Sequence, residues 1–228
     1  AVVGRGGMLK PIASGVYQVN DAMKSDLYDH PIKEHASNLG GLIADDIARA
    51  LPDAKAYIAD PVVVDELDEI ARVSGHPLFK RISIFHALNQ KSIARQHAKS
   101  IMKHYEDLNL IIVHMGGGIT IGAHQKGKVI DVNQGLDGEG PFSPERSGTL
   151  PSGDLVRFCF SGKYSEKEVL KMVVGNGGIV AYLGTNSAYE AEQRAQNGDE
   201  QAKFILEALA YQVAKSIGSM VPVLKGEV

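Results

Sequence analysis

Three consecutive glycines between two apolar segments constrain this chain more than any other feature of its sequence. Residues 108–114 form an apolar run that predicts a buried strand, and residues 119–123 predict a second strand directly after Gly116, Gly117 and Gly118. Because glycine lacks a side chain, successive backbone N–H groups at this bend can approach a polyanion and form an anion-binding nest. A tight hairpin between core strands explains the same glycines equally well. The spacing fits neither the dinucleotide fingerprint GxGxxG nor the phosphate loop GxxxxGKS/T.

The composition bounds the class of protein. With 44% hydrophobic and 22% charged residues among 228, the chain can bury a substantial core, and intrinsic disorder is excluded. The 24 Lys and Arg against 27 Asp and Glu give a net charge of −3, which argues against nucleic acid as the main partner. The single cysteine, Cys159, excludes an internal disulfide and fits a reducing compartment. No apolar run approaches the ~20 residues of a membrane helix, so we expect a cytoplasmic protein without a membrane partner.

The first part of the chain alternates between helical and strand patterns. Apolar residues at helical spacing, among them Leu39, Ile43 and Ile47, predict a helix over residues 35–51, and a second helix is expected over residues 88–105. Shorter elements are expected as a turn-rich stretch over 15–29, a strand over 54–59, a short helix over 64–73, and strands over 119–123 and 128–132 joined by a hairpin turn.

The last third of the chain is predicted to be mostly helical. A loop rich in Gly, Pro and Ser covers residues 135–153, and loops of this length are usually functional or disordered. After this loop, helical segments separated by glycine-rich joints are expected over residues 154–160, 166–174, 187–196 and 199–221. An order of mixed α/β elements followed by helices predicts a sheet with flanking helices, built of two parts.

Arg146 is the candidate for anion binding within the long loop. It precedes Ser147 and Gly148, and a guanidinium in such a flexible setting can hold two phosphate oxygens at once. A solvated surface arginine beside Glu145 is the alternative interpretation of the same residues. The length of the loop favours the functional interpretation.

Three further side chains are candidates because each stands at the end of an apolar segment. His86 precedes a predicted helix, where it can donate a hydrogen bond to a phosphoryl or carboxylate group, although a lone histidine is more often structural. Asp60 follows the predicted strand over 54–59 and is either a turn residue or a functional carboxylate. Arg5 lies between glycines, where backbone and guanidinium can meet a small anion.

Two other kinds of active site are not indicated. The eight histidines show no HExxH or similar ligand spacing, so a zinc site is not expected. No GxSxG motif marks the nucleophile of a serine hydrolase.

Five segments in this order carry a resemblance to a known family. They are residues 2–12, 60–66, 85–91, 114–120 and 138–148. Taken together, the segments resemble the acetate/butyrate kinase family, within the sugar kinase, Hsp70 and actin superfamily. Five ordered matches are far more specific than any one of them.

The resemblance implies an α/β fold of the actin-like ATPase (ribonuclease H-like) type, with two similar domains around a cleft. Residues 1–107 would be the remainder of the first domain with inserted helices, and residues 108–228 the second domain. Both ends of the chain are apolar, which predicts a piece of a longer protein, incomplete at both termini. Without an upstream phosphate hairpin and a downstream adenosine strand, this chain alone is expected to bind ATP poorly and to turn over little or nothing.

The resemblance also implies a reaction: reversible transfer of a phosphoryl group from ATP to the carboxylate of butanoate, with Mg²⁺, giving butanoyl phosphate and ADP. By motif, His86, Asp60 and Arg146 match a His, an Asp and an Arg of the acyl-phosphate site, and Arg5 is assigned as the second Arg. Asp60 would hold Mg²⁺ through water or orient an arginine.

Residues for the nucleotide are implied in the same way. The segment similar to the phosphate loop supplies His114, Gly116, Gly117, Gly118 and Thr120, and the segment similar to the adenosine-side loop supplies Gly184, Thr185, Asn186 and Tyr189. A homo-oligomer is expected from the family. A kinase for acetate or isobutanoate, and a non-catalytic relative that binds a nucleotide, stay open as alternatives.

Overall fold

The computed structural model describes residues 1–29, 31 and 35–228, so His30, one of the histidines considered for a zinc site, lies outside it. The described chain divides into two compact units, each treated by itself below. Unit 1 consists of Ala1–Ile112 and His124–Val132, and unit 2 consists of Val113–Ala123 and Asn133–Val228. These units are defined by contacts within the chain, whereas the expected actin-like domains, residues 1–107 and 108–228, come from the family resemblance. The expected division into domains therefore stays a prediction.

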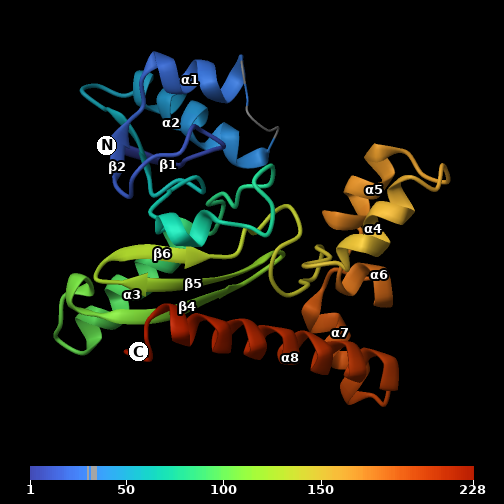
Figure 1. The fold of residues 1–228 in the computed structure, drawn as a ribbon. Coiled ribbons are helices and arrows are strands. Elements are labelled where there is room, and N and C mark those ends of the chain that lie inside the picture. Colours follow the sequence, from blue (N-terminus) through green and yellow to red (C-terminus); the bar gives the residue numbers. More distant parts are fainter. Residues whose placement is uncertain (30, 32–34) are drawn as a thin grey trace. The chain divides into compact units, whose positions relative to one another are not determined.

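The first part of the chain carries a small mixed sheet and several helices (Figure 1). Strand β1 runs parallel to β3, and β2 runs antiparallel to β3, in the order β1-β3-β2. The elements are β1 (Val2–Arg5), β2 (Val16–Gln18), α1 (Asp21–Tyr28), η1 (Ala36–Asn38), α2 (Leu39–Arg49), β3 (Ala56–Ala59), η2 (Glu69–Arg72), α3 (Ala87–Ser100) and η3 (Tyr105–Asp107).

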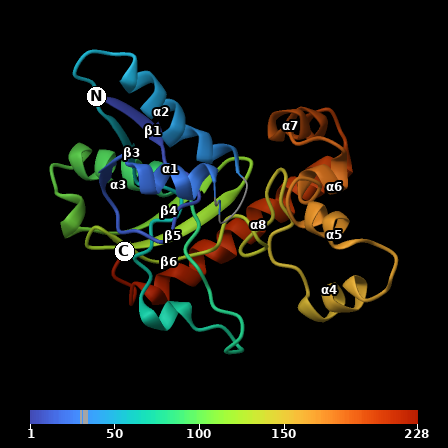
Figure 2. The ribbon, with the colours of Figure 1, turned by 90° about the horizontal axis from the view of Figure 1, so that it is seen from above.

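A second sheet has the order β4-β5-β6, and the helical part of the chain follows it. Two residues connect β5 to β6, a connection that only antiparallel strands allow. Helix α7 packs against the long helix α8 (Figure 2). The elements are β4 (Asn109–Met115), β5 (Ile119–Gln125), β6 (Lys128–Val132), α4 (Ser152–Cys159), α5 (Glu166–Val173), α6 (Ile179–Leu183), α7 (Ala188–Gln196) and α8 (Glu200–Val223).

The structure confirms most expected elements and corrects three. Residues 15–29 are not merely turn-rich, since they contain β2 and α1, whose first turn is capped by the Asn20 side chain accepting from the Met23 N–H. Residues 64–73 form no α-helix and contain only the short η2. Helix α6 lies between the glycine joints, where no element was predicted.

Helix α2 packs against β1 through its small residues rather than through its large apolar ones (Figure 2). Its buried residues are Gly41, Ala44 and Ala48, whereas Leu39, Ile43 and Ile47, and Leu51 just beyond its end, are each about half exposed. A side chain at Gly40 would collide with the Arg5 carbonyl, and one at Gly4 with the Gly40 carbonyl. Two glycines therefore set the distance between this helix and the strand.

A buried polar network joins α3 to the β5–β6 hairpin within unit 1. The Tyr105 hydroxyl lies 2.6 Å from His124 Nδ1, and His124 Nε2 lies 2.9 Å from Gln90 Oε1. Lys91 Nζ lies 2.7 Å from Glu66 Oε2 and donates to the Gly127 carbonyl. Burial lowers the pKa of His124 to about 3, and the Lys91 charge adds to this effect. His124 is therefore neutral in the folded protein at neutral pH.

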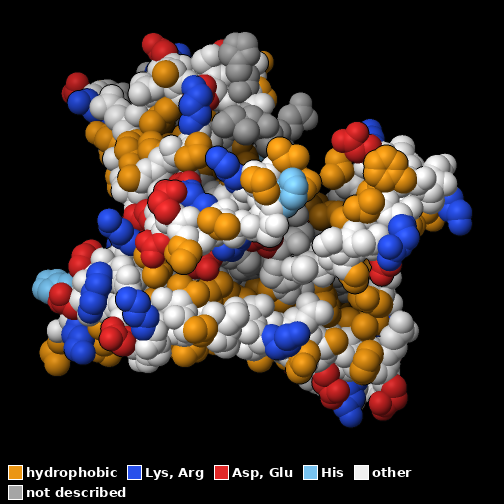
Figure 3. Space-filling view, in the orientation of Figure 1, with side chains coloured by type: hydrophobic (Ala, Val, Ile, Leu, Met, Phe, Trp, Pro, Cys, Tyr) orange, Lys and Arg blue, Asp and Glu red, His pale blue; other side chains and the backbone are white. Residues whose placement is uncertain are grey.

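The exposed surface of the helical part includes large apolar side chains. On α4 and α5 and the turn after α4, Val156, Phe160 and Leu170 are 55%, 88% and 57% exposed. Figure 3 shows hydrophobic side chains on the surface of the part of the chain that contains α4 and α5. Cys159, at the end of α4, is also exposed. None of the helices in the described part of the chain is both long and apolar enough to cross a membrane.

We expect Gly40→Ala to lower the free energy of unfolding by about 1–3 kcal/mol, because the added methyl group meets the Arg5 backbone. The loss should appear although alanine is the better helix former. Gly75→Ala is the control, since a methyl group there meets no atom within 4 Å. Urea unfolding measures both, and equal stability of the two variants would contradict the close approach of α2 to β1.

We expect the protein to lose stability as the pH falls from about 6.5 toward 3, because the unfolded chain protonates His124 and the folded chain does not. The slope from this residue is at most about 1.4 kcal/mol per pH unit. Urea unfolding at about pH 7.5 and about pH 5 measures it. His124→Gln keeps an amide between Tyr105 and Gln90 and should flatten the slope, and an unchanged slope in this variant would exclude His124 as its source.

Candidate functional site

The triple-glycine bend between β4 and β5 is closed by its own backbone and by one buried side chain. The Gly116 N–H donates to the Gly118 carbonyl at 3.1 Å. The Ser143 hydroxyl, which is fully buried, donates to the Gly117 carbonyl at 2.6 Å. The bend is thereby fixed to the long loop that follows β6.

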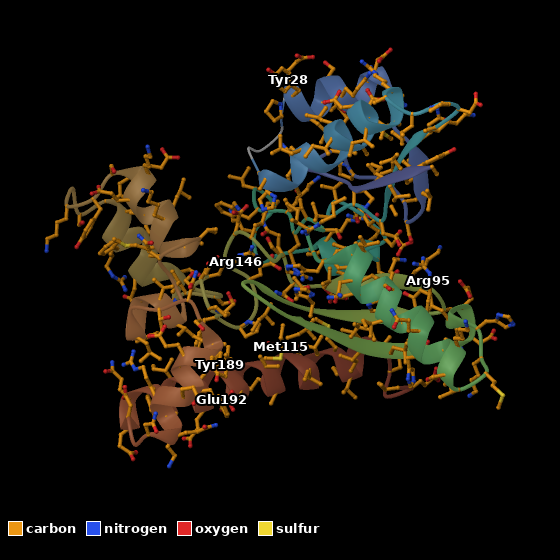
Figure 4. The ribbon with its side chains drawn as sticks, turned by 180° about the vertical axis from the view of Figure 1, so that it is seen from behind. Tyr28, Arg95, Met115, Arg146, Tyr189 and Glu192 are labelled. Carbon is orange, nitrogen blue, oxygen red and sulfur yellow. The ribbon has the colours of Figure 1, made fainter. Side chains whose placement is uncertain are left out.

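Arg146 lies directly against this bend. A side chain at Gly118 would collide with the Arg146 guanidinium, which also donates through Nη1 to the Gly135 carbonyl. Figure 4 shows Arg146 near the Met115 end of β4. Burial lowers the pKa of Arg146, while the Glu145 and Asp137 carboxylates act in the opposite direction. The glycine bend and Arg146, predicted separately, therefore form one structure within unit 2.

Glu145 connects the bend to the segment expected on the adenosine side. Its Oε1 accepts from Asn186 Nδ2 at 2.6 Å, and a side chain at Gly117 would stand 3.6 Å from its Oε2. Two of the segments predicted to bind a nucleotide, residues 114–120 and 184–189, therefore lie close to the same carboxylate in unit 2.

The other predicted residues of unit 2 have varied surroundings. The His114 imidazole lies over the bend, where its Nε2 would be 2.9 Å from a Cβ at Gly116. Thr120 is fully buried in β5. Gly184 ends α6 in a left-handed conformation, and the Thr185 hydroxyl donates to Glu190 at 2.7 Å. Tyr189 is 72% exposed at the start of α7.

Arg5 and Asp60 stand at the same edge of the first sheet. Arg5 is the last residue of β1 and pairs with Ala59, and Asp60 directly follows Ala59. Since β1 and β3 are parallel, their carboxyl ends meet at one edge. Arg5 is exposed, whereas Asp60 is buried. The glycine on each side of Arg5 allows close packing, Gly4 against Gly40 and Gly6 against Pro61.

Asp60 holds three parts of unit 1 together. Its Oδ1 accepts from the Ser14 hydroxyl at 2.6 Å and from the Gly15 N–H at 2.9 Å. Its Oδ2 accepts from Arg95 Nη1 of α3 at 3.0 Å. The backbone φ of +36° is unusual for a residue other than glycine, and such strain is often found at functional sites.

His86 occupies the N-cap position of α3 and is partly exposed. The positive end of the helix dipole lies at this terminus. Within unit 1 the structure therefore places Arg5 at the end of β1 and Asp60 directly after the adjoining strand β3. It places His86 at the start of the helix whose Arg95 binds Asp60.

No group of three or more His, Cys, Asp and Glu side chains that could hold a metal ion occurs among residues 1–29, 31 and 35–228. Ser143, Glu145 and Arg95 were not recognised from the sequence as parts of a site. Ser143 and Glu145 lie within the loop predicted over residues 135–153. The length of this loop was the sequence feature that indicated a functional role for it. No local pattern marks Arg95.

The fold is that of the acetate and propionate kinases. The crystal structure of Porphyromonas gingivalis acetate kinase matches with a TM-score of 0.82 over 98% of this chain and 58% of that chain, at 19% identity. A propionate kinase from Francisella tularensis subsp. tularensis matches with a TM-score of 0.75 over 97% of this chain and 59% of that chain, at 23% identity. The expectation of an actin-like ATPase fold agrees with these neighbours.

Residues 78–228 match the acetokinase family, and the chain belongs to this family. Butyrate kinase 2 from Clostridium acetobutylicum is 60% identical over all 228 residues. The chain spans 64% of the length of that relative.

We expect Gly118→Ala to destabilise the protein by about 1–3 kcal/mol, because the methyl group takes the space of the Arg146 guanidinium. Gly153→Ala is the control, since it also places a methyl group beside an arginine, Arg157, but at an ordinary 3.5 Å. Urea unfolding of both variants measures the difference. Combining Gly118→Ala with Arg146→Ala should recover part of the loss, and strictly additive losses would contradict the contact.

Proposed function

We propose that the complete protein containing this chain transfers a phosphoryl group reversibly between ATP and the carboxylate of butanoate. The observation that carries the proposal is the 60% identity to Butyrate kinase 2 along the whole chain. Membership of the acetokinase family supports a carboxylate as the acceptor group. A cytoplasmic homo-oligomer is part of the same proposal.

In unit 2 the glycine bend and Arg146 are assigned to the phosphates. Phosphoryl transfer needs positioning and charge neutralisation more than covalent participation by the protein. The backbone amides of Gly117 and Gly118 would cradle the ATP phosphates, while the Gly116 N–H keeps the bend closed through its bond to the Gly118 carbonyl. The preorganised guanidinium of Arg146 would stabilise the charge on the transferred group. The Gly135 carbonyl and the bare Gly118 backbone support this role because they hold the guanidinium in one place.

In unit 2 the nucleoside side is assigned to residues 184–189. Asn186 is the best supported of them, since its link to Glu145 joins it to the bend. Gly184 and Thr185 would set the shape of the loop through their backbone and hydroxyl contacts, and Tyr189 offers an exposed ring.

In unit 1 His86, Asp60 and Arg5 are assigned to the acyl phosphate. His86 would donate a hydrogen bond to the carboxylate or to the transferred group, and Arg5 would add a second guanidinium. Of the two roles considered for Asp60, orienting an arginine is the better supported, because Oδ1 already has two donors and Oδ2 accepts from Arg95.

Mg²⁺ is expected as the cofactor because it is typical of the family. Bound Mg²⁺ neutralises phosphate charge and usually retains several waters, so it needs few protein ligands. In the second of its two roles, Asp60 would hold Mg²⁺ through water.

A hydroxamate assay on the complete protein tests the function, because hydroxylamine traps an acyl phosphate. Production from butanoate and ATP supports the proposal. A kcat/KM for acetate or isobutanoate above that for butanoate would assign a different acid. No product with any of the three acids would favour a non-catalytic nucleotide-binding relative.

We expect Arg146→Lys in the complete protein to lower kcat at least about 100-fold, because a lysine keeps the charge but not the two-pronged hydrogen bonding. Arg157→Lys is the matched control on exposed α4 and should leave kcat unchanged. Steady-state kinetics with butanoate measures both. A kcat within a few-fold of the wild-type value would remove Arg146 from the site.

A further inference from the structure

Ser143 is a buried hydroxyl to which the proposed function gives no role. The residue has no exposed surface, and its Oγ donates to the Gly117 carbonyl at 2.6 Å. Gly117 itself is exposed, in the middle of the glycine bend. The hydrogen bond therefore draws one carbonyl of the bend toward the interior of unit 2.

This carbonyl belongs to the same peptide plane as the Gly118 N–H. The peptide bonds of the described chain are trans, and in a planar trans peptide the C=O and N–H groups point in opposite directions. Because Ser143 holds the carbonyl, the Gly118 N–H is directed away from Ser143. One hydroxyl thus sets the direction of one of the two amides assigned to the ATP phosphates.

The bend needs such a contact because its residues are glycines. Glycine adopts positive and negative φ with similar ease, so the peptide between Gly117 and Gly118 can rotate with little steric resistance. A rotated peptide would present a carbonyl oxygen, which repels phosphate, in place of the N–H. The bond from the Gly116 N–H to the Gly118 carbonyl closes the bend but engages the peptides on either side of this one. The Ser143 hydroxyl acts on the rotating peptide itself.

The backbone of Ser143 is fixed on both sides. Its N–H donates to the Arg146 carbonyl at 2.9 Å, and its carbonyl accepts from the Ile179 N–H at 3.1 Å. A side chain at Gly178 would collide with the Ser143 carbonyl, so this part of the loop lies tightly against the start of α6. The hydroxyl is therefore held in place before any ligand binds.

The amide that Ser143 orients adjoins the cation of the same site. Gly118 is buried, and the Arg146 guanidinium stands where a Gly118 side chain would be. An oriented amide dipole and a guanidinium side by side attract the same anion. Ser143 contacts the carbonyl of the peptide and the Arg146 backbone, so it is linked to both parts of this pair.

We propose that Ser143 is a positioning residue for phosphoryl transfer, whose hydroxyl keeps the Gly118 N–H directed toward the ATP phosphates. The inference rests on the proposed function and assigns to it a residue that acts without touching the nucleotide. Since the amide serves ATP, loss of the hydroxyl weakens ATP binding and leaves butanoate binding unchanged.

Steady-state kinetics of Ser143→Ala in the complete protein tests this role. We expect the KM for ATP to rise at least about fivefold and the KM for butanoate to stay within about twofold of the wild-type value. A merely structural loss would lower the fraction of active enzyme, and with it kcat, without changing either KM. If Ser143→Ala does not fold, Ser143→Cys decides, because a thiol fills the space with a weaker donor and should raise the KM for ATP.

Ser83→Ala is the matched control. The Ser83 hydroxyl is also buried and donates to a backbone carbonyl, that of Val64, at 2.6 Å. Its removal deletes the same kind of hydrogen bond in unit 1, so it should cost similar stability and leave the KM for ATP unchanged. An equal rise in the KM for ATP in both variants would overturn the positioning role of Ser143.

Two further measurements separate this inference from the proposed function. Calorimetric titration with ATP gives a Kd without turnover, and it should be at least about fivefold higher for Ser143→Ala than for the wild type. The amide NMR signal of Gly118, observed after ¹⁵N-glycine labelling, should shift in Ser143→Ala and stay in place in Ser83→Ala. Equal Kd values would overturn the inference even where the wild type forms butanoyl phosphate. A wild type that binds ATP but forms no acyl phosphate would overturn the function, and a higher Kd in Ser143→Ala would still support the orienting role.

Discussion

Unit 2 depends on the contact between a guanidinium and a backbone without a side chain. Arg146 can occupy its position only because residue 118 is glycine, and there it donates to the Gly135 carbonyl. The same loop sends Ser143 to the Gly117 carbonyl and Glu145 to Asn186. Burial removes much of the water around a guanidinium. The charge is then stable only when fixed carbonyl dipoles and carboxylate charges take the place of that water. The contact therefore orders three chain segments around a positively charged cradle.

The fold was predictable where the pattern is local. Strands on both sides of the glycine bend and the helix α3 follow from their apolar periodicity, and they appear close to the expected residues. The buried face of α2 was not predictable from that pattern, because Gly40 and Gly4 let the backbones approach so closely that small residues pack and Ile43 stays exposed. Periodicity predicts that a helix forms, but glycine contacts decide which face it buries.

The sequence predicted candidate residues for the site, but not the groups that hold those residues in place. Motifs pointed to Arg146 and Asp60, whereas the groups that fix them lie far away in sequence. Arg95 is 35 residues from Asp60, and Ser14 is 46 residues from it. The Lys91–Glu66 pair and His124 in the core were missed for the same reason, since nothing local marks a polar residue whose partner arrives from another element. Buried polar groups need hydrogen-bond partners. The fold brings these partners from distant parts of the sequence, so the local pattern does not predict them.

The lone thiol of Cys159 has a practical consequence. It is exposed at the end of α4 in unit 2, and it is the one cysteine of the sequence. A maleimide fluorophore can therefore label the wild-type chain at a single defined point. Adding one surface cysteine to unit 1 would give a donor–acceptor pair, whose energy transfer reports how the separation between the units responds to nucleotide.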